Sequence, residues 1–173
     1  MIASSSAIEC PSLLAHLIGT KKVQQVLSDP KVLSEYITDA SMHDVFTKMY
    51  PSVPDDISNI VMKPQREGGG HNIFTKDIPH HISHLKSDDH ISNYVFMELI
   101  NPPIEKNVLV KSGQASNECD CISELGVYGG LVLNGTEIIW DANLGSLLRT
   151  KSHGTNEGGV ASGHSCLDSP HLI

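Results

Sequence analysis

The sequence predicts an α+β fold, with short helices flanking strands in the first part and an antiparallel sheet in the second. Two observations support this class. Apolar residues between positions 12 and 27 keep helical spacing. Between positions 94 and 140, β-branched and aromatic runs are separated by Gly, Pro and Asn, which is typical of strands and turns. A length of 173 residues suits one domain.

Composition excludes several classes of partner. Hydrophobic residues make up 39% and charged residues 18% of the chain, as in ordinary globular proteins. A formal net charge of −8 argues against nucleic acids and anionic membrane surfaces, which need a basic surface. Neither a signal peptide nor an apolar run of about 20 residues is evident, so we expect a cytoplasmic protein without a membrane span.

The first helical region is predicted to break at Gly19, with Thr20 capping a second helix that begins at Lys21. Lys21 and Lys22 then lie in a first turn, where positive charge opposes the helix dipole. A bound anion would neutralise them, although two solvated lysines are the simpler alternative. Residues 32–37 and 45–49 continue as short helices, the last ending before Pro51.

The later strands are predicted from similar signals. Residues 94–100 form a central strand, and residues 108–110 form a shorter one. Two strands at 119–125 and 127–133 are separated at Gly126. Asn134 and Gly135 form a hairpin turn into residues 136–140.

The most informative stretch is Lys63 to Asn72, which follows a short buried strand at residues 59–62. Three glycines permit positive φ and close approach to a ligand, Lys63 suits a phosphate, and Glu67 offers an oxygen to Mg²⁺. The stretch is not a P-loop, because no Lys-Ser/Thr follows the glycines. A surface loop with a glycine triplet is the alternative interpretation.

Histidines and cysteines give weaker indications. A helix over residues 77–85 turns Ile78, Ile82 and Leu85 inward and carries His80 and His84 four residues apart, but without a third zinc ligand we expect no metal there. The four cysteines are expected to be reduced thiols. Cys119 and Cys121 share one face of a strand, a spacing that differs from a metal-type CxxC.

A second small-residue stretch, from Gly154 to Gly163, follows Arg149 and Lys151. Its composition is typical of a mobile loop, and the two cations at its base would let it close over an anionic ligand. A disordered tail with two ordinary charges explains the same composition.

Six segments carry a pattern in a fixed order along the chain, namely Gly19 to Gln25, Lys63 to Asn72, Met97 to Ile100, Cys121 to Gly126, Leu147 to Lys151 and Gly158 to Ala161. Taken together, they resemble eukaryotic glutathione synthetase. The resemblance spans nearly the whole chain and corresponds to the C-terminal part of that family. It implies a partial ATP-grasp fold with an antiparallel sheet, flanking helices and glycine-rich loops. Over residues 1–173 it implies the nucleotide-binding portion of that fold.

The resemblance also assigns residues. It implies ATP and Mg²⁺ as cofactors, with Glu67 as a magnesium ligand, and Arg149 and Lys151 as the catalytic cations. Arg149, Val160 and Ala161 match positions that hold γ-glutamylcysteine. The positions that match nucleotide contacts are Lys21, Lys63, Pro64, Gln65, Arg66, Glu67, Gly68, Gly69, Gly70, His71, Asn72, Phe74, Met97, Glu98, Leu99, Ile100, Glu124, Lys151 and Glu157.

The implied reaction joins γ-glutamylcysteine to glycine through an acyl phosphate made from ATP, and full-length members can form homodimers. Three positions depart from the family, with Phe74 for tyrosine, Leu99 for lysine and Glu157 for aspartate. Family members extend far upstream, so we expect a fragment whose independent turnover is doubtful. The alternative is a noncatalytic nucleotide-binding or dimerisation module from the same family.

Overall fold

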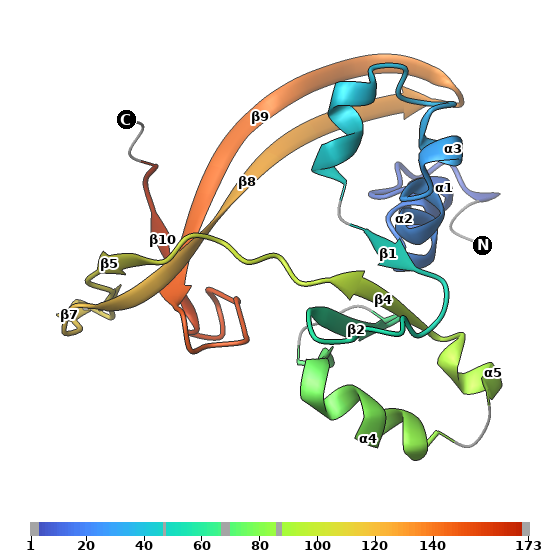
Figure 1. Ribbon diagram of the computed structural model, residues 1–173. Helices are drawn as coiled ribbons and strands as arrows, with labels where there is room; N and C mark the ends of the chain where they lie inside the picture. Colours follow the sequence, from blue (N-terminus) through green and yellow to red (C-terminus); the bar gives the residue numbers. More distant parts are fainter. Residues whose placement is uncertain (1–3, 47, 67–69, 86–87, 171–173) are drawn as a thin grey trace. The chain divides into compact units, whose positions relative to one another are not determined.

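A computed structural model describes residues 4–46, 48–66, 70–85 and 88–170 (Figure 1). The chain forms two compact units, residues 1–100 and residues 101–173. No helix within the described ranges has the length and apolar character that a membrane crossing requires. The α+β class predicted from the sequence is confirmed by helices and antiparallel sheets in the first unit and sheets in the second.

The first unit is built on a four-stranded antiparallel sheet in the order β1-β4-β2-β3. Its strands are β1 (Met49–Tyr50), β2 (Ile60–Pro64), β3 (Ile73–Phe74) and β4 (Tyr94–Glu98). The predicted strand at 59–62 therefore runs two residues further and includes Lys63. The predicted strand at 94–100 is central, as expected, and ends at Glu98.

One helix packs against this sheet and completes the core. A 3-10 turn, η3 (Thr75–Asp77), leads into α4 (Ile78–Ser83), and α5 (Asp88–Ile91) follows. Met62, Ile78 and Phe96 are at most 1% exposed, and Ile82 and Leu85 pack against them. The predicted inward face of this helix is confirmed.

The N-terminal helices are α1 (Leu13–Ile18), α2 (Lys21–Leu27) and α3 (Pro30–Leu33). Gly19 separates the first two, as predicted, and the amide of Ala15 donates to the N-cap Ser12. Thr20 occupies the N-cap of α2, but its hydroxyl donates backward to the carbonyl oxygen of Leu17 instead of capping the helix.

The prediction of a helix over residues 45–49 is wrong. Instead η2, a 3-10 helix, spans Ala40–Val45, and Met49 and Tyr50 form β1. The residues opposite them in the ladder with β4 are Met97 and Phe96. Sheet pairing explains the change, because a tertiary partner can override the weak helical preference of a short apolar run. The predicted helix at 32–37 is likewise shortened, since α3 ends at Leu33.

The second unit is dominated by one long hairpin, drawn in yellow-orange and orange in Figure 1. Its strands are β8 (Cys119–Asn134) and β9 (Glu137–Ser152), flanked by β5 (Glu105–Asn107) and β10 (Ser165–Asp168) in the order β10-β9-β8-β5. A separate two-stranded sheet joins β6 (Val110–Lys111) and β7 (Gln114–Ala115). The predicted hairpin is confirmed, with Gly135 at a φ of 62° and Thr136 as its loop residues.

The predicted break at Gly126 is wrong, because β8 is continuous through it. The absence of a side chain at Gly126 is explained by the close approach of the Tyr128 ring and not by a turn in the backbone. A Cβ atom on Gly126 would lie 2.9 Å from the hydroxyl oxygen of Tyr128, so the tyrosine ring lies over the glycine. The strand continues to Asn134, with irregular pairing at 128/129 and 132/133.

Alternation along β8 and β9 gives the hairpin base two chemically different faces. Glu124 lies opposite Arg149, and Ile122 lies opposite Lys151; we call this the Arg149 face. Cys121 lies opposite Ser152, and Ser123 lies opposite Thr150; these residues with Cys119 form the Cys121 face. Cys121 and Thr150 are 1% exposed, whereas Cys119 and Ser152 are half-buried and Ser123 is exposed, so the Cys121 face is buried at two of its five residues.

Candidate functional site

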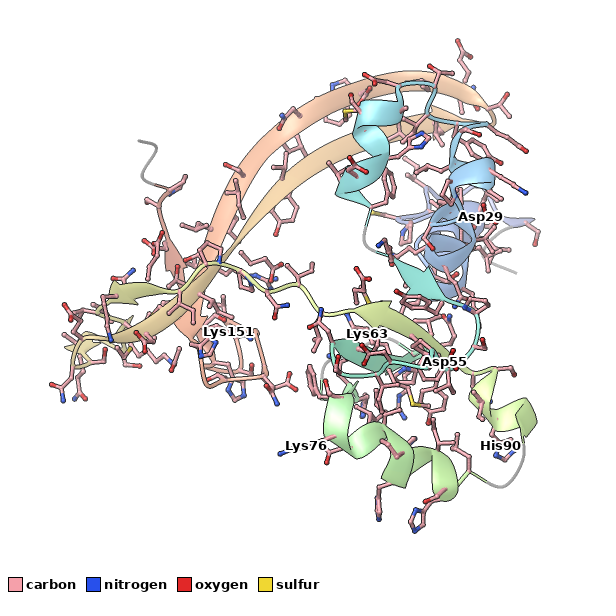
Figure 2. The ribbon with its side chains drawn as sticks, viewed as in Figure 1. Asp29, Asp55, Lys63, Lys76, His90 and Lys151 are labelled. Atoms are coloured by element: carbon pink, nitrogen blue, oxygen red, sulfur yellow. The ribbon has the colours of Figure 1, made fainter. Side chains whose placement is uncertain are left out.

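Lys63 is held in place by the most buried strand of the first unit. Val61 and Met62 precede it at 2% and 0% exposure, and Lys63 itself lies opposite Val95 of β4 (Figure 2). Beyond the strand, the amide of Gln65 donates to the carbonyl oxygen of Asn93 at 2.9 Å. The chain therefore leaves the sheet at a fixed point just before the glycines.

Lys21 lies at the same point, although 45 residues separate it from Arg66. Its Nζ donates to the carbonyl oxygen of Arg66 at 3.0 Å. The first turn of α2 thus delivers one of the predicted phosphate lysines to the segment that Lys63 begins. Sequence spacing alone gave no sign of this contact, because it joins two distant segments.

The middle of the glycine stretch, Glu67, Gly68 and Gly69, lies outside the described residues. Gly70 has a φ of 80°, as expected for a glycine that takes a conformation other residues avoid. His71 and Asn72 are exposed, and Phe74 is half-buried on β3 opposite Val61.

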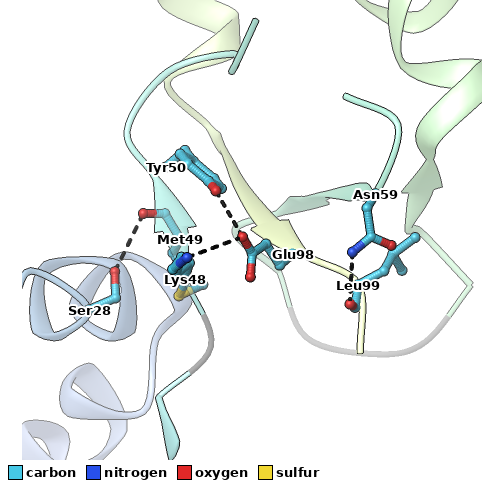
Figure 3. Close-up of polar contacts among 7 residues, drawn as sticks. All are labelled: Ser28, Lys48, Met49, Tyr50, Asn59, Glu98 and Leu99. Atoms are coloured by element: carbon cyan, nitrogen blue, oxygen red, sulfur yellow. Dashed lines mark hydrogen bonds and ion pairs between the residues drawn. The ribbon is translucent and has the colours of Figure 1, made fainter. Parts of the chain in front are cut away.

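The stretch from Met97 to Ile100 spans the end of β4, an inner strand. Met97 lies between Met49 of β1 and Val61 of β2. The amide of Leu99 donates to the carbonyl oxygen of Asn59 at 3.0 Å, and the Asn59 side chain donates to that of Leu99 at 3.4 Å (Figure 3). Ile100 lies beyond the ladder and is 73% exposed. Contact of this backbone with adenine stays a prediction.

Glu98 is part of a small polar cluster at the same strand end (Figure 3). The hydroxyl of Tyr50 donates to its Oε1 at 3.0 Å, and Lys48 Nζ lies 3.9 Å from the same atom. The hydrogen bond to this carboxylate raises the pKa of Tyr50 above its ordinary value. The Glu98 carboxylate is thereby held in a defined orientation.

A cavity of about 370 Å³ opens beside Gln65 and Arg66, just before the glycine stretch. The sequence did not predict it. Gln65, Arg66, His90 and Asn93 line it, together with Tyr94. The Gln65 Nε2 atom is buried and has no hydrogen-bond partner within the described part of the chain. No local sequence pattern indicates this cavity, because its walls come from β2, β4 and the helical segment before β4.

The two histidines of the predicted pair lie at the end of one helix, with His80 within α4 and His84 at its C-cap. The rings of His80 and His84 lie 4.4 Å apart, while His81 Nε2 lies 3.0 Å from the Tyr94 hydroxyl. Within the described ranges, no group of three or more potential metal ligands is present.

In the second unit, the structure brings Glu124, Arg149 and Lys151 together on the Arg149 face. An Nη2 atom of Arg149 donates to Oε1 of Glu124, and their side chains are 34% and 68% exposed. Lys151 Nζ donates to the carbonyl oxygen of Asn156 at 3.2 Å (Figure 2). One carboxylate and two cations are therefore presented by adjacent strands.

The glycine-rich stretch after Lys151 is the connection between β9 and β10. Ser165 anchors its far end, since its hydroxyl donates to the carbonyl oxygen of Gly158 at 2.8 Å. Glu157 and Val160 are half-buried within it, and Ala161 is exposed. The alternative of a disordered tail is wrong, because β10 follows and pairs with β9.

Comparison with known proteins decides the family. The model of the eukaryotic glutathione synthase ATP-binding domain matches residues 3–172. The chain belongs to the eukaryotic glutathione synthase family. It is 36% identical to the glutathione synthetase of Xenopus laevis over 190 residues, and 37% identical to the chloroplastic glutathione synthetase of Arabidopsis thaliana over 187. These alignments cover the whole chain but 40% and 34% of the two relatives.

A solved structure supports the fold. The glutathione synthetase-like effector from Globodera pallida, in its apo form, superposes with a TM-score of 0.76 and 24% identity. It covers 99% of this chain, which in turn covers 38% of that structure. The partial ATP-grasp fold that the resemblance implied is therefore confirmed.

Proposed function

We propose that this chain is the nucleotide-binding portion of a glutathione synthetase. Such an enzyme uses ATP to join γ-glutamylcysteine and glycine into glutathione. The observation that carries the proposal is the contact between Lys21 Nζ and the carbonyl oxygen of Arg66. The contact brings Lys21 to the segment that begins with Lys63, just before the glycine stretch, which supports a role for both lysines in binding phosphate.

Phosphate binding by this arrangement follows from its chemistry. Ammonium groups are compact donors that suit phosphate oxygens, and glycine backbone can approach a polyphosphate closely. Pro64, Gln65 and Arg66 fix the start of the loop, while Gly70, His71 and Asn72 follow its described end. The adenine would then lie against the backbone of residues 97–100, with Phe74 on the neighbouring β3.

Mg²⁺ is proposed at Glu67. This cation is held in proteins by one or two carboxylates together with substrate phosphates, so a single glutamate beside the phosphates fits its chemistry. When bound, the ion would neutralise phosphate charge.

The Arg149 face would hold the reacting groups. Arg149 is proposed to grip a carboxylate of γ-glutamylcysteine through its planar fork, and Glu124 orients the guanidinium by accepting from Nη2. Lys151 would neutralise the transferring phosphoryl group. Glu157, Val160 and Ala161 belong to the loop that Lys151 contacts, so its closure would exclude water from the bound dipeptide.

These residues supply alignment and charge rather than covalent chemistry. ATP phosphorylates the cysteinyl carboxylate, and the amine of glycine then attacks the acyl phosphate to give glutathione, ADP and phosphate. Positioned cations stabilise the charge that develops on the phosphoryl oxygens. Cytoplasm is the predicted compartment, although relatives from two plants are named chloroplastic.

A noncatalytic module is the second candidate. Its support is the share of the relatives' length that the chain covers, which is 34% to 40%. In addition, one relative is named the large chain of the Schizosaccharomyces pombe enzyme. The outer hairpin also exposes apolar side chains, including Val127 at 69% and Ile138 at 61%. Such a surface suits a companion polypeptide or a second copy.

Calorimetry with Mg-ATP tests nucleotide binding by the chain itself. We expect measurable affinity that falls at least tenfold in Lys21→Ala and in Lys63→Ala, with Lys76→Ala as an exposed lysine control. Equal effects in all three variants would mean that the phosphate site is misplaced. Turnover with γ-glutamylcysteine and glycine then separates the enzyme from the noncatalytic module.

A further inference from the structure

Side-chain hydrogen bonds join three strands on the Cys121 face. They connect Ser123 of β8, Thr150 of β9 and Asp168 of β10, and we call them the Thr150 bridge. The hydroxyl of Thr150 donates to Oδ2 of Asp168 at 2.8 Å, and its oxygen lies 2.8 Å from Oγ of Ser123. Because a hydroxyl has one proton and that of Thr150 goes to the carboxylate, the Ser123 hydroxyl is the donor in the second bond.

Thr150 is the buried member of this bridge. It is 1% exposed, whereas Ser123 and Asp168 are exposed. A buried hydroxyl is costly unless it is hydrogen-bonded, so the two bonds explain how a polar side chain is tolerated at this depth. Valine has nearly the same shape and would fill the same space without a hydroxyl. The hydroxyl therefore serves the bridge and not the packing.

The bond to Asp168 reaches a short edge strand. β10 has four residues and lies at the end of its sheet, next to β9. Cys166 lies opposite Thr150 in the ladder between them, so Asp168 is the diagonal neighbour, two residues further along. A strand of this length has few ladder bonds to hold its register. The bridge adds a side-chain bond that opposes sliding of β10 along β9.

The two proposed cations, Arg149 and Lys151, flank Thr150 in sequence. Strand alternation directs them to the opposite face, so the Thr150 hydroxyl lies away from whatever they bind. Ser165 of β10 lies opposite Lys151, and its hydroxyl holds the carbonyl oxygen of Gly158 inside the glycine-rich connection. A shift of β10 along β9 would therefore move this connection relative to both cations.

We propose that Thr150 is a positioning residue for the reaction assigned to the Arg149 face. Its hydroxyl, held between Ser123 and Asp168, fixes β10 on β9 and thereby places the glycine-rich connection relative to the two cations. This role rests on the proposed function. Thr150 makes and breaks no bond of a substrate, and it exchanges no proton with one. Misplacing reacting groups by about 1 Å can cost on the order of 100-fold in rate, so the anchor affects turnover.

Kinetics of a full-length enzyme that carries this segment test the role. In Thr150→Val we expect kcat to fall by roughly 10- to 100-fold, because the anchor of β10 is lost. KM for ATP should change by less than about twofold, since the proposed phosphate lysines of the first unit are untouched. Thr150→Ser restores a hydroxyl and should recover most of the activity. If packing alone mattered, Thr150→Ser would be the more harmful change, because it deletes a buried methyl group.

A double-mutant cycle tests the partner of the hydroxyl. Asp168→Ala should lower kcat about as much as Thr150→Val, and the double variant should lose little more, because residues that act as one unit are not additive. Asp168 is exposed, so its replacement removes the same bond even if Thr150→Val does not fold. Thr136→Val is the matched control, because it removes a threonine hydroxyl in the hairpin loop, and it should keep the parent activity. Additive losses in the double variant would overturn the proposal.

Amide hydrogen exchange of the chain itself measures the anchor without any reaction. In Thr150→Val the amides of β10 that pair with β9 should exchange at least about tenfold faster, while those near the hairpin turn keep the parent rate. Unchanged exchange in β10 would overturn the positioning role. A loss of dipeptide use in Arg149→Lys together with full activity in Thr150→Val would overturn that role alone. Intact dipeptide use in Arg149→Lys would instead refute the proposed function on which it rests.

Discussion

Replacing Arg149 by lysine tests the proposed substrate contact most directly. The change keeps the positive charge but removes the planar fork. Because the Arg149 and Glu124 side chains are 34% and 68% exposed, their ion pair contributes only about 0–1 kcal/mol to stability. Losing a charge-assisted contact to the dipeptide instead costs about 1.5–3 kcal/mol. That range corresponds to roughly a 10- to 150-fold loss in kcat/KM.

The assay is steady-state kinetics in a full-length enzyme that carries this segment, with one substrate varied at a time. We expect the loss to fall on γ-glutamylcysteine, with the ATP constants nearly unchanged and the melting temperature close to that of the parent. Lys106→Ala is the control, because it breaks another exposed ion pair, with Asp120 at 2.7 Å. An unchanged dipeptide kcat/KM together with a raised ATP constant would refute the assigned role.

Three further predictions concern the chain itself. Met62→Ala should destabilise the first unit by about 2–5 kcal/mol, because it leaves a cavity at a fully buried position; unchanged urea unfolding would contradict this. Burial raises the pKa of the Cys121 thiol to about 11 from an ordinary 9.0. Stability should therefore fall as pH rises above about 9, where the unfolded thiol ionises and the folded one does not. Urea midpoints from pH 8 to 10.5 should show a smaller decline in Cys121→Ala, and parallel declines would exclude this cause. Gly135→Val should lower stability by about 1–2 kcal/mol, since a branched residue is strained at positive φ; an unchanged melting temperature would argue against it.

Local patterns predicted the elements that depend on neighbouring residues. Gly19 separated two helices, and the apolar period of residues 78–85 identified the inward face of α4. The hairpin after Asn134 followed from turn chemistry. The predictions failed where pairing between distant strands determines the backbone conformation. An example is β1, whose two residues are extended because they pair with β4.

The candidate site divides in the same way. Residue chemistry identified Lys63, Arg149 and Lys151, and alternation along a strand explains why the last two share a face. The contact between Lys21 and Arg66, and the pairing of Arg149 with Glu124, join segments 45 and 25 residues apart. Such contacts depend on register and helix placement, which short sequence windows do not contain.

The two faces of the hairpin base also limit how this part of the family can change in length. Inserting or deleting one residue between Cys121 and Glu124 would turn the following side chains over, so Glu124 would leave the face that carries Arg149. A change of two residues would preserve the faces but shift Glu124 away from Arg149. Length variation is therefore better tolerated beyond residue 128, where pairing is already irregular and local bulges can absorb an extra residue.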